Sequence, residues 1–261
     1  MNAGQNAQKG GASGMKITVA TALHKPYRTP QDAMYLPVQV GAGEPLGCQR
    51  DDQGENISAL NPTFCELTAQ YWLWKNRDAD ALGLCHYRRY FTQRRFGRRD
   101  ARILTQAQAE ALLRDADVLV PRPRWYLIET NGSHYAHAHG PQGLELARQV
   151  IAQQHPDCLP AFDRVMKRRH GRRFNMCIMK KAQFAAYSAW LFSILMEMEA
   201  RSRATLHLER DSRLFGFVAE RLMDVWLEHT QPRIRQLRVL HLERQHWPRK
   251  IAGFLRRKFR G

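Results

Sequence analysis

The densest group of residues with chemical potential is the run His86, Tyr87, Arg88 and Arg89. An arginine guanidinium is a planar fork that matches pairs of phosphate oxygens, so this run could stabilise negative charge that develops on a departing phosphate or diphosphate. It follows residues 81–85, a short apolar segment that predicts a buried strand. Ligands of open α/β sheets bind beyond the carboxyl ends of the strands. We therefore expect the four residues to line a site; the alternative is that the arginines only cover a sheet edge.

A transfer to a hydroxyl group also needs a base that takes up the hydroxyl proton. Glu220 is the candidate, because it lies in the first half of a strongly patterned helix predicted over residues 214–228. Asp224 follows one turn later, so the two carboxylates share a face. Asp211 is the next candidate for the base. The alternative for Glu220 is a helix-surface carboxylate beside an arginine, with no chemical role.

Three histidines, His134, His137 and His139, form a local cluster. On a strand, His137 and His139 would point to the same face. Neutral imidazoles bind metals, yet no cysteine or carboxylate lies at a spacing that would complete a metal site. Contact with an acceptor or a phosphate, and a structural role, are the other interpretations.

Strand and helix patterns alternate along the chain, which predicts an α/β domain with a mainly parallel sheet and a helix-rich C-terminal half. The predicted strands cover residues 16–21, 35–40, 81–85, 118–120 and 174–179. One helix is predicted to begin at the Asn61-Pro62 pair, and others cover residues 105–113, 143–154, 159–168, 182–200 and 214–228. Thr105 and Gln108 have the spacing of a capping box.

The composition is that of a globular protein, since 44% of the 261 residues are apolar or aromatic and 25% are charged. The five cysteines are widely spaced without a Cys-x-x-Cys pair, so we expect free thiols and a reducing, cytoplasmic location. No secretory signal is visible; residues 1–14 are interpreted as a disordered leader, and the domain is predicted to cover residues 15–246. The longest apolar stretch, residues 184–198, is too short and too interrupted to span a membrane.

The net charge of +17 indicates an anionic partner: a nucleic acid, an anionic membrane or a phosphorylated ligand. Residues 247–261 predict a basic amphipathic helix, whose apolar face consists of Trp247, Ile251, Phe254, Leu255 and Phe259. We expect this helix to bind an anionic membrane surface, because each nearby basic residue gains about 1 kcal/mol there; the alternative is a terminal helix packed on the domain. A nucleic-acid-binding protein is the runner-up class, but no helix-turn-helix, zinc finger or RNP-like motif is present.

Short blocks of characteristic sequence are spread over the chain. They are residues 35–42 (YLPVQVGA), 55–58 (ENIS), 61–74 (NPTFCELTAQYWLW), 83–91 (GLCHYRRYF), 117–121 (DVLVP), 133–139 (SHYAHAH), 174–180 (FNMCIMK) and 215–227 (FGFVAERLMDVWL). In this order they resemble a bacterial capsule and exopolysaccharide glycosyltransferase family long catalogued as a domain of unknown function. The likeness runs from about Met15 to Phe259, and HYRRYF and NPxFCELT are its most specific blocks.

The resemblance implies a fold of the GT-A type, in which a Rossmann-like sheet binds the nucleotide and the C-terminal half binds the acceptor. It also implies transfer of galactofuranose from UDP-galactofuranose with inversion, which gives a β-linked product. The acceptor would be a lipid-linked surface polysaccharide at the inner face of the cytoplasmic membrane. A retaining or metal-dependent hexosyltransferase with a UDP-pyranose donor is the alternative among enzymes, and an inactive scaffold is a further one.

Carried over to this sequence, the resemblance places catalysis on Glu220, Arg88, Arg89 and His86. The donor side would be lined by His24, Lys25, Gln39, Val40, Gly41, Asn56, Ser58, Glu66 and Tyr87. The acceptor side would be lined by His134, His137, Asn175 and Asp224. Turn and cap chemistry is the alternative for Asn56 and Ser58, and a structural ion pair with an arginine is the alternative for Glu66.

Many GT-A enzymes hold a divalent metal with an Asp-x-Asp motif just after a buried strand, and this sequence departs from that pattern. His86, Tyr87 and Arg88 occupy the comparable place, while the literal copy, Asp115-Ala116-Asp117, precedes its strand. We interpret Asp115 and Asp117 as a helix end and a strand start. Cationic side chains would then replace the metal. Mg²⁺ or Mn²⁺ on the diphosphate is the alternative, and no metal ligand is assigned.

Overall fold

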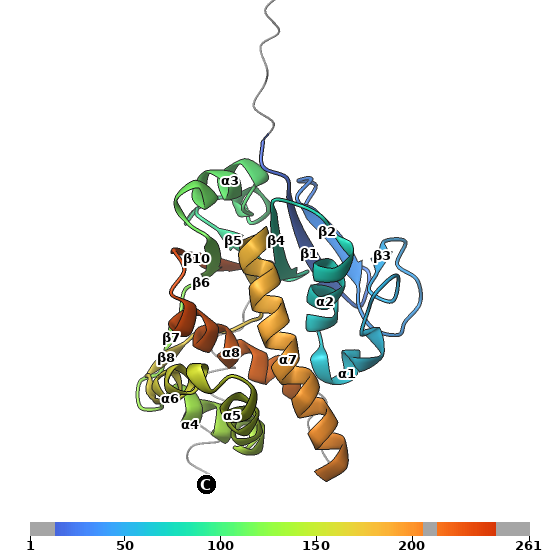
Figure 1. Ribbon diagram of the computed structural model, residues 1–261. Helices are drawn as coiled ribbons and strands as arrows, with labels where there is room; N and C mark the ends of the chain where they lie inside the picture. Colours follow the sequence, from blue (N-terminus) through green and yellow to red (C-terminus); the bar gives the residue numbers. More distant parts are fainter. Residues whose placement is uncertain (1–13, 206–212, 244–261) are drawn as a thin grey trace, which may run out of the picture.

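A computed structural model describes residues 14–205 and 213–243, through which an eight-stranded mixed sheet runs (Figure 1). Its strands are β1 (Ile17–Leu23), β2 (Tyr35–Gln39), β3 (Gln49–Arg50), β4 (Ala81–His86), β5 (Arg89–Thr92), β6 (Val118–Pro121), β9 (Cys177–Lys180) and β10 (Ile234–His241). A separate two-stranded ribbon joins β7 (Arg124–Trp125) to β8 (His170–Gly171). The helix predicted over residues 247–261 and nearly all of the predicted leader lie outside the described residues.

Eight α-helices are found in the described ranges: α1 (Asn61–Phe64), α2 (Leu67–Asn76), α3 (Gln106–Asp115), α4 (Asn131–His139), α5 (Gln142–Gln154), α6 (Leu159–Lys167), α7 (Lys181–Thr205) and α8 (Leu214–Thr230). Short 3₁₀ turns are η1 (Ser58–Leu60), η2 (Asp100–Arg102) and η3 (Pro156–Cys158). No helix within these ranges is long and apolar enough to cross a bilayer. The α/β class and the helix-rich C-terminal half are as the sequence predicts.

The sheet is mixed and not mainly parallel as predicted, because its described strands form as many antiparallel as parallel pairs. β1 pairs in parallel with β2 and β4, and β2 pairs in parallel with β3. β9 lies antiparallel to both β4 and β6, and β10 is parallel to β6 and antiparallel to β5. The cause is visible in Figure 1: α4, α5 and α6 lie beyond the carboxyl ends of the parallel strands, and the chain returns to the sheet from that side.

Apolar side chains cover both faces of the sheet and form two cores. Ile17 and Val19 of β1 belong to the core under α3, whereas Ala20 and Ala22 belong to the core under α2, α7 and α8. Gly83 of β4 lets β9 approach, because a Cβ atom there would lie 2.5 Å from the Cys177 carbonyl oxygen. These two layers fix the carboxyl ends of β1, β2 and β4 at one edge.

The helix predicted from Asn61 is broken in the structure. Cys65 takes a left-handed φ of 53°, which separates α1 from α2. The Asn61 side chain donates to the Cys65 carbonyl oxygen over 2.9 Å and so bridges the break. The capping box of Thr105 and Gln108 is confirmed. Asp115 ends α3 and Asp117 directly precedes β6, as interpreted from the sequence.

Candidate active site

The parallel register brings the predicted donor-side residues to one edge of the sheet. His24 and Lys25 follow β1, Val40 and Gly41 follow β2, and the Tyr87-Arg88 turn follows β4. β1 and β4 run in register, with Ala22 opposite His86. The segment before β9 reaches the same edge, because β9 runs antiparallel to β4 and pairs Cys177 with Leu84.

Tyr87 is the centre of an aromatic cluster at this edge. Its fully buried ring lies 4.3 Å from the ring of His86, 5.5 Å from that of His24 and 4.8 Å from that of Tyr27, between ring centroids. The Lys25 ammonium and the Arg88 guanidinium lie 5.9 and 5.1 Å from the same ring. The cluster therefore holds cations from two strand ends over one ring.

His24 and His86 are neutral at physiological pH. Burial, with Arg89, Arg88 and His24 nearby, lowers the pKa of His86 to about 3. Burial, with Arg88 and Lys25, also lowers the pKa of His24. The backbone N–H of Arg88 donates to His86 Nδ1 over 3.3 Å, so the proton of the neutral ring is on Nε2. Neither ring adds charge to the site, but both can form hydrogen bonds.

Arg89 is held by an aromatic ring and by no ion pair within the described ranges. Its guanidinium lies 4.2 Å from the ring centroid of Phe174, and burial lowers its pKa while Glu66 and Glu220 act in the opposite direction. Arg173 is similar: burial lowers its pKa, and Glu220 opposes the shift. Two half-buried cations thus interact with carboxylates only at a distance, and no direct ion pair within the described ranges neutralises them.

Glu220 lies at the centre of these charges. Its Oε1 accepts from the Phe174 N–H over 3.0 Å, and its Oε2 lies 2.7 Å from the Arg221 guanidinium. Burial raises the pKa of Glu220, and Glu66 adds to the rise, while Arg221, the Phe174 N–H and Arg173 oppose it. A carboxylate with a raised pKa is a stronger base than an ordinary glutamate.

The segment before β9 is anchored to α8 and α2 by polar contacts. Asp224 accepts from the Arg172 N–H over 2.7 Å and pairs with its guanidinium, and Asn175 donates to Glu66 Oε1 and to the Gly216 carbonyl oxygen over 3.1 and 3.0 Å. Asn175 Oδ1 is buried, with no hydrogen-bond partner within the described ranges. Phe174, between these anchors, has a φ of 75°, a strained conformation that clusters at functional sites.

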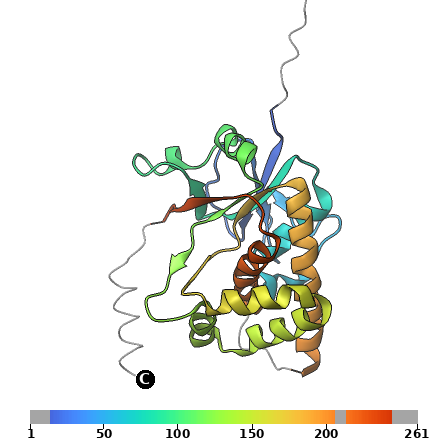
Figure 2. The ribbon, with the colours of Figure 1, turned by 60° about the vertical axis from the view of Figure 1, so that its left-hand side comes forward.

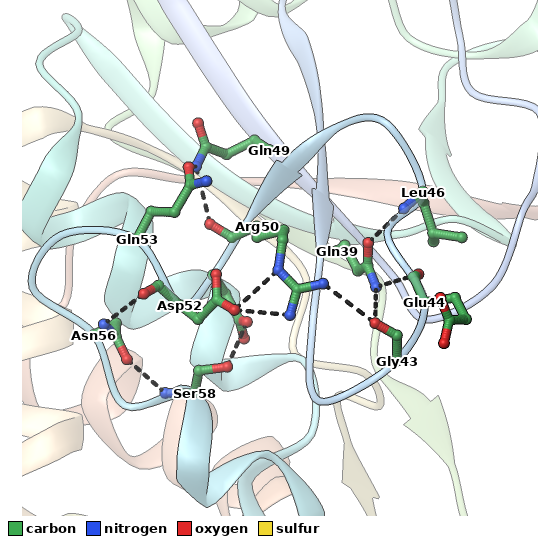
Figure 3. A network of polar contacts seen from close by, with 11 residues as sticks. Gln39, Gly43, Glu44, Leu46, Gln49, Arg50, Asp52, Gln53, Asn56 and Ser58 are labelled. Carbon is green, nitrogen blue, oxygen red and sulfur yellow. Dashed lines mark hydrogen bonds and ion pairs between the residues drawn. The ribbon is translucent and has the colours of Figure 1, made fainter.

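The loops after β2 and β3 are held by side chains that the resemblance assigns to donor binding (Figure 3). Gln39 donates to the Glu44 carbonyl oxygen over 2.9 Å and accepts from the Leu46 N–H over 2.8 Å. Ser58 donates to Asp51 over 2.6 Å, and Asn56 accepts from the Ser58 N–H over 3.2 Å. These three side chains shape the loops, and their contact with a donor stays a prediction.

The structure requires a glycine at position 41. Its φ is +74°, and a Cβ atom would lie 2.4 Å from Asn61 Oδ1. The chain between β2 and α1 therefore passes close to Asn61 without a side chain between them. Val40, beside it, is buried in the core.

The three clustered histidines, of which His134 and His137 are predicted to contact the acceptor, lie on helix α4 and not on a strand. They meet different partners: His134 packs on Tyr126 at 4.3 Å, His137 Nδ1 lies 2.7 Å from Glu129, and His139 stacks on Phe217 at 3.9 Å. Burial lowers the pKa of His134, and Arg173 and Arg221 add to this shift. His137 is exposed.

The residues at this edge do not fit a divalent cation. Mg²⁺ takes oxygen ligands, but Glu220 and Asp224 are bonded to backbone N–H groups and arginines, and Glu66 is bonded to Asn175. The described ranges contain one group with metal-ligand spacing, Asp157, Cys158 and His229, at the far end of α8. The Asp117 carboxylate pairs with Lys180 and Arg233 and is a structural tie.

Sequence reasoning missed Arg173, Arg221 and Tyr126. Tyr126 is buried near Arg221, Arg173 and Glu220, and its hydroxyl has no hydrogen-bond partner within the described ranges. Arg221 is 2% exposed and lies 5.4 Å from the Tyr135 ring. Two arginines, Arg172 and Arg173, precede an apolar strand and could have suggested an anion site. They point to this edge of the sheet only if the strand is known to be antiparallel.

Comparisons with known proteins place the chain in a family and show a protein of similar fold. The family model described as "Domain of unknown function (DUF4422)" matches residues 16–231. The structure is similar to the apo structure of the WbbM bifunctional glycosyltransferase, with a TM-score of 0.81 and 26% sequence identity. The similarity covers 88% of this chain and 46% of that one, so the chain spans about half the length of that protein. No curated protein matches the chain in sequence.

Proposed function

Because the chain belongs to the family described as domain of unknown function DUF4422, and because its fold is similar to that of a glycosyltransferase, we propose that it transfers a sugar from a nucleotide donor to a glycan acceptor. The site is the carboxyl edge of β1, β2 and β4 together with the segment before β9. The arginines at this edge would bind the diphosphate of the donor.

The observation that carries this proposal is the uncompensated positive charge of Arg89 and Arg173. Both guanidinium groups are half-buried, and neither has an ion-pair partner within the described ranges. Keeping such charges away from water is costly unless a ligand neutralises them. A diphosphate brings delocalised negative charge and several acceptor oxygens, which match guanidinium forks.

The proposed reaction is a displacement at the anomeric carbon. The acceptor hydroxyl oxygen bonds to that carbon, the bond from carbon to the diphosphate oxygen breaks, and the diphosphate leaves with the electron pair. Glu220 takes the hydroxyl proton, helped by its raised pKa. Arg88 and Arg89 stabilise the charge on the leaving diphosphate, and the neutral His86 can donate from Nε2.

The donor is proposed to be UDP-galactofuranose, and inversion would give a β-linked product on a lipid-linked surface polysaccharide. The proposed location is the inner face of the cytoplasmic membrane. His24, Lys25, Gly41 and Tyr87 would contact the nucleotide, while His134, His137, Asn175 and Asp224 would lie toward the acceptor.

Two alternative functions make different demands on the site. A metal-dependent enzyme with a pyranose donor would need a divalent cation, for which the donor set described above is unsuitable. A nucleic-acid-binding protein would use the basic surface but has no need for a buried base such as Glu220.

A donor screen tests the proposal. The protein is incubated with UDP-, GDP- and dTDP-sugars and a synthetic lipid-linked acceptor, with and without a chelator, and the product is examined by NMR. We expect turnover with UDP-galactofuranose, a β-linkage and no loss of activity with the chelator. Turnover only with a pyranose donor and added Mn²⁺ would support the first alternative.

A further inference from the structure

Large apolar side chains are exposed at the tips of two protruding loops. Trp125, the last residue of β7, is 70% exposed, and Leu127 and Ile128 in the bend that follows are 92% and 67% exposed. Phe96 is 80% exposed in the loop between β5 and η2. Apolar side chains this large are seldom left in water in such a group unless they meet a partner.

The bend after β7 is held in place rather than loosely attached. The Tyr126 N–H donates to the Arg169 carbonyl oxygen over 2.8 Å, and the Trp125 ring packs on His170 at 4.7 Å. On the far side, Thr130 begins α4 with a capping box. Tyr126 is buried against the site while its neighbours point outward, so the bend presents its apolar side chains beside the candidate active site.

Both tips are surrounded by arginine. Phe96 lies between Arg94-Arg95 and Arg98-Arg99, and the bend after β7 has Arg122, Arg124 and Arg169 next to it, all of them exposed. None of these seven arginines forms an ion pair within the described ranges. The nearest carboxylates are engaged elsewhere, since Asp100 pairs with Arg28 and Glu129 pairs with His137.

The two tips extend from the same side of the molecule. In Figure 2, the loop after β5 and the β7 strand both project at the left-hand edge of the ribbon. The chain after β10 links the first tip to the site: Arg99 donates to the Leu242 carbonyl oxygen over 2.7 Å, and the Leu242 N–H donates to the Arg88 carbonyl oxygen over 3.0 Å.

We propose that the two tips, residues 93–99 and 122–128, form a docking surface for an anionic phospholipid bilayer. Tryptophan and leucine at protruding tips enter the interface between headgroups and acyl chains, and the surrounding arginines bind the anionic headgroups. The surface deepens the membrane location in the proposed function and rests on it, because docking here places the site beside a lipid-linked acceptor.

A bilayer fits these tips better than a protein or a nucleic acid. Protein partners bind apolar patches at the centre of an interface, whereas these side chains are divided between two separate protruding loops. A nucleic acid would use the arginines but would leave Leu127 and Ile128 in water. A membrane surface accommodates both kinds of side chain at once.

The test is vesicle flotation with the full chain. Vesicles of phosphatidylcholine and phosphatidylglycerol (70:30) are compared with pure phosphatidylcholine. We expect binding to the anionic vesicles alone, a loss of about tenfold or more in W125S/L127S/I128S, and a smaller loss in Phe96→Ser. Arg124→Gln should weaken binding about fivefold, the equivalent of one basic residue at the surface, while the matched exposed control Arg114→Gln on α3 should bind as the unchanged protein does.

Turnover of a water-soluble acceptor is measured on the same variants and separates the two claims. The triple variant should keep this activity, because its side chains point away from the site. Vesicle binding that is unchanged in the triple variant overturns the docking surface, as does a finding that these residues mediate dimers or DNA binding instead. Normal docking without any turnover would sink the proposed function and leave the docking surface standing.

Discussion

Arg89 stacks on the ring of Phe174. An arginine with a purely structural role would instead pair with a carboxylate. An aromatic ring holds the guanidinium in place without neutralising it, so its hydrogen-bonding edge stays available for a ligand. The positive φ of Phe174 places the ring at this position, and the Glu220 contact to its N–H stabilises the turn. This geometry supports the proposal that Arg89 binds an anion.

Replacing Arg89 tests that interpretation. We expect Arg89→Ala to lower kcat by about 100-fold or more, the usual loss when one preorganised charge-stabilising group is removed. Arg89→Lys should recover only part of the rate, because an ammonium cannot form the planar double contact. Arg114→Ala, an exposed arginine on α3, serves as the control and should have normal kinetics. Equal activity of all three variants would exclude Arg89 from catalysis.

Glu220 gives the site a characteristic pH dependence. The base must be ionised, and its pKa is raised, so the acid limb of the rate profile should have its midpoint above pH 4.5. Arg221→Met removes the largest opposing charge and should move that limb to higher pH. Glu220→Gln should abolish turnover and still fold, because the amide oxygen can accept from the Phe174 N–H.

The same pKa has a consequence for stability. A raised pKa in the folded protein means that the folded state binds this proton more tightly than the unfolded chain does. The stability that the protonated carboxyl group contributes at low pH is therefore lost as the pH rises above the pKa of the group in the unfolded chain. Glu220→Gln should therefore become more stable relative to the unchanged protein between pH 4 and pH 7, as measured by thermal unfolding. If the difference in stability between the variant and the unchanged protein shrinks over that range, the pKa of Glu220 is lowered and not raised.

At the scale of elements, α8 organises the site. It sends Glu220 to the Phe174 N–H and Asp224 to the Arg172 N–H, so one helix face fixes the segment that enters β9. The two carboxylates that share a helix face in the sequence thus have different tasks in the structure. Asp224 is almost fully engaged by Arg172, which favours a positioning role for it.

The approach of the β2 loop to α1 can be tested with a pair of glycines. Gly41→Ala should destabilise the fold by more than about 2 kcal/mol, since it combines a left-handed φ with a clash against Asn61. Gly47→Ala shares the positive φ, but nothing lies within 4 Å of its Cβ, so it should cost only about 1 kcal/mol. Urea unfolding measures both. Equal losses would mean that Asn61 moves aside without cost.

Much of the edge could be predicted from sequence, because parallel strands end at one place. The apolar runs of β1, β2 and β4 were enough to bring Lys25, Gly41 and Arg88 together. The direction of β9 could not be read from the short apolar run of residues 174–180, because hydrophobic patterns carry no information on strand direction. For the same reason Arg173 was missed. The break at Cys65 was hidden as well, since helix periodicity continues through Phe64 and Leu67 on both sides of it.

At the scale of the whole molecule, the net charge of +17 is divided by location. One part, which includes Arg88, Arg89 and Arg173, gathers at the carboxyl edge beside a buried carboxylate. Another part surrounds the exposed apolar tips at residues 93–99 and 122–128. Compensated arginines, such as Arg148 with Asp163 and Arg164 with Glu228, lie on the helical part of the domain. The two proposed anionic partners, a diphosphate and a membrane, would each meet one of the first two parts.

The most direct test of the central claim follows a labelled sugar. The unchanged protein and Arg89→Ala are incubated with UDP-galactofuranose labelled in the sugar and with a soluble acceptor, and labelled glycan and free UDP are counted together. We predict one UDP released for each sugar transferred, with at least a 100-fold lower rate in Arg89→Ala. Label that stays on the nucleotide with every donor tried, or equal transfer by both proteins, would contradict a glycosyl transfer centred on this arginine-lined edge.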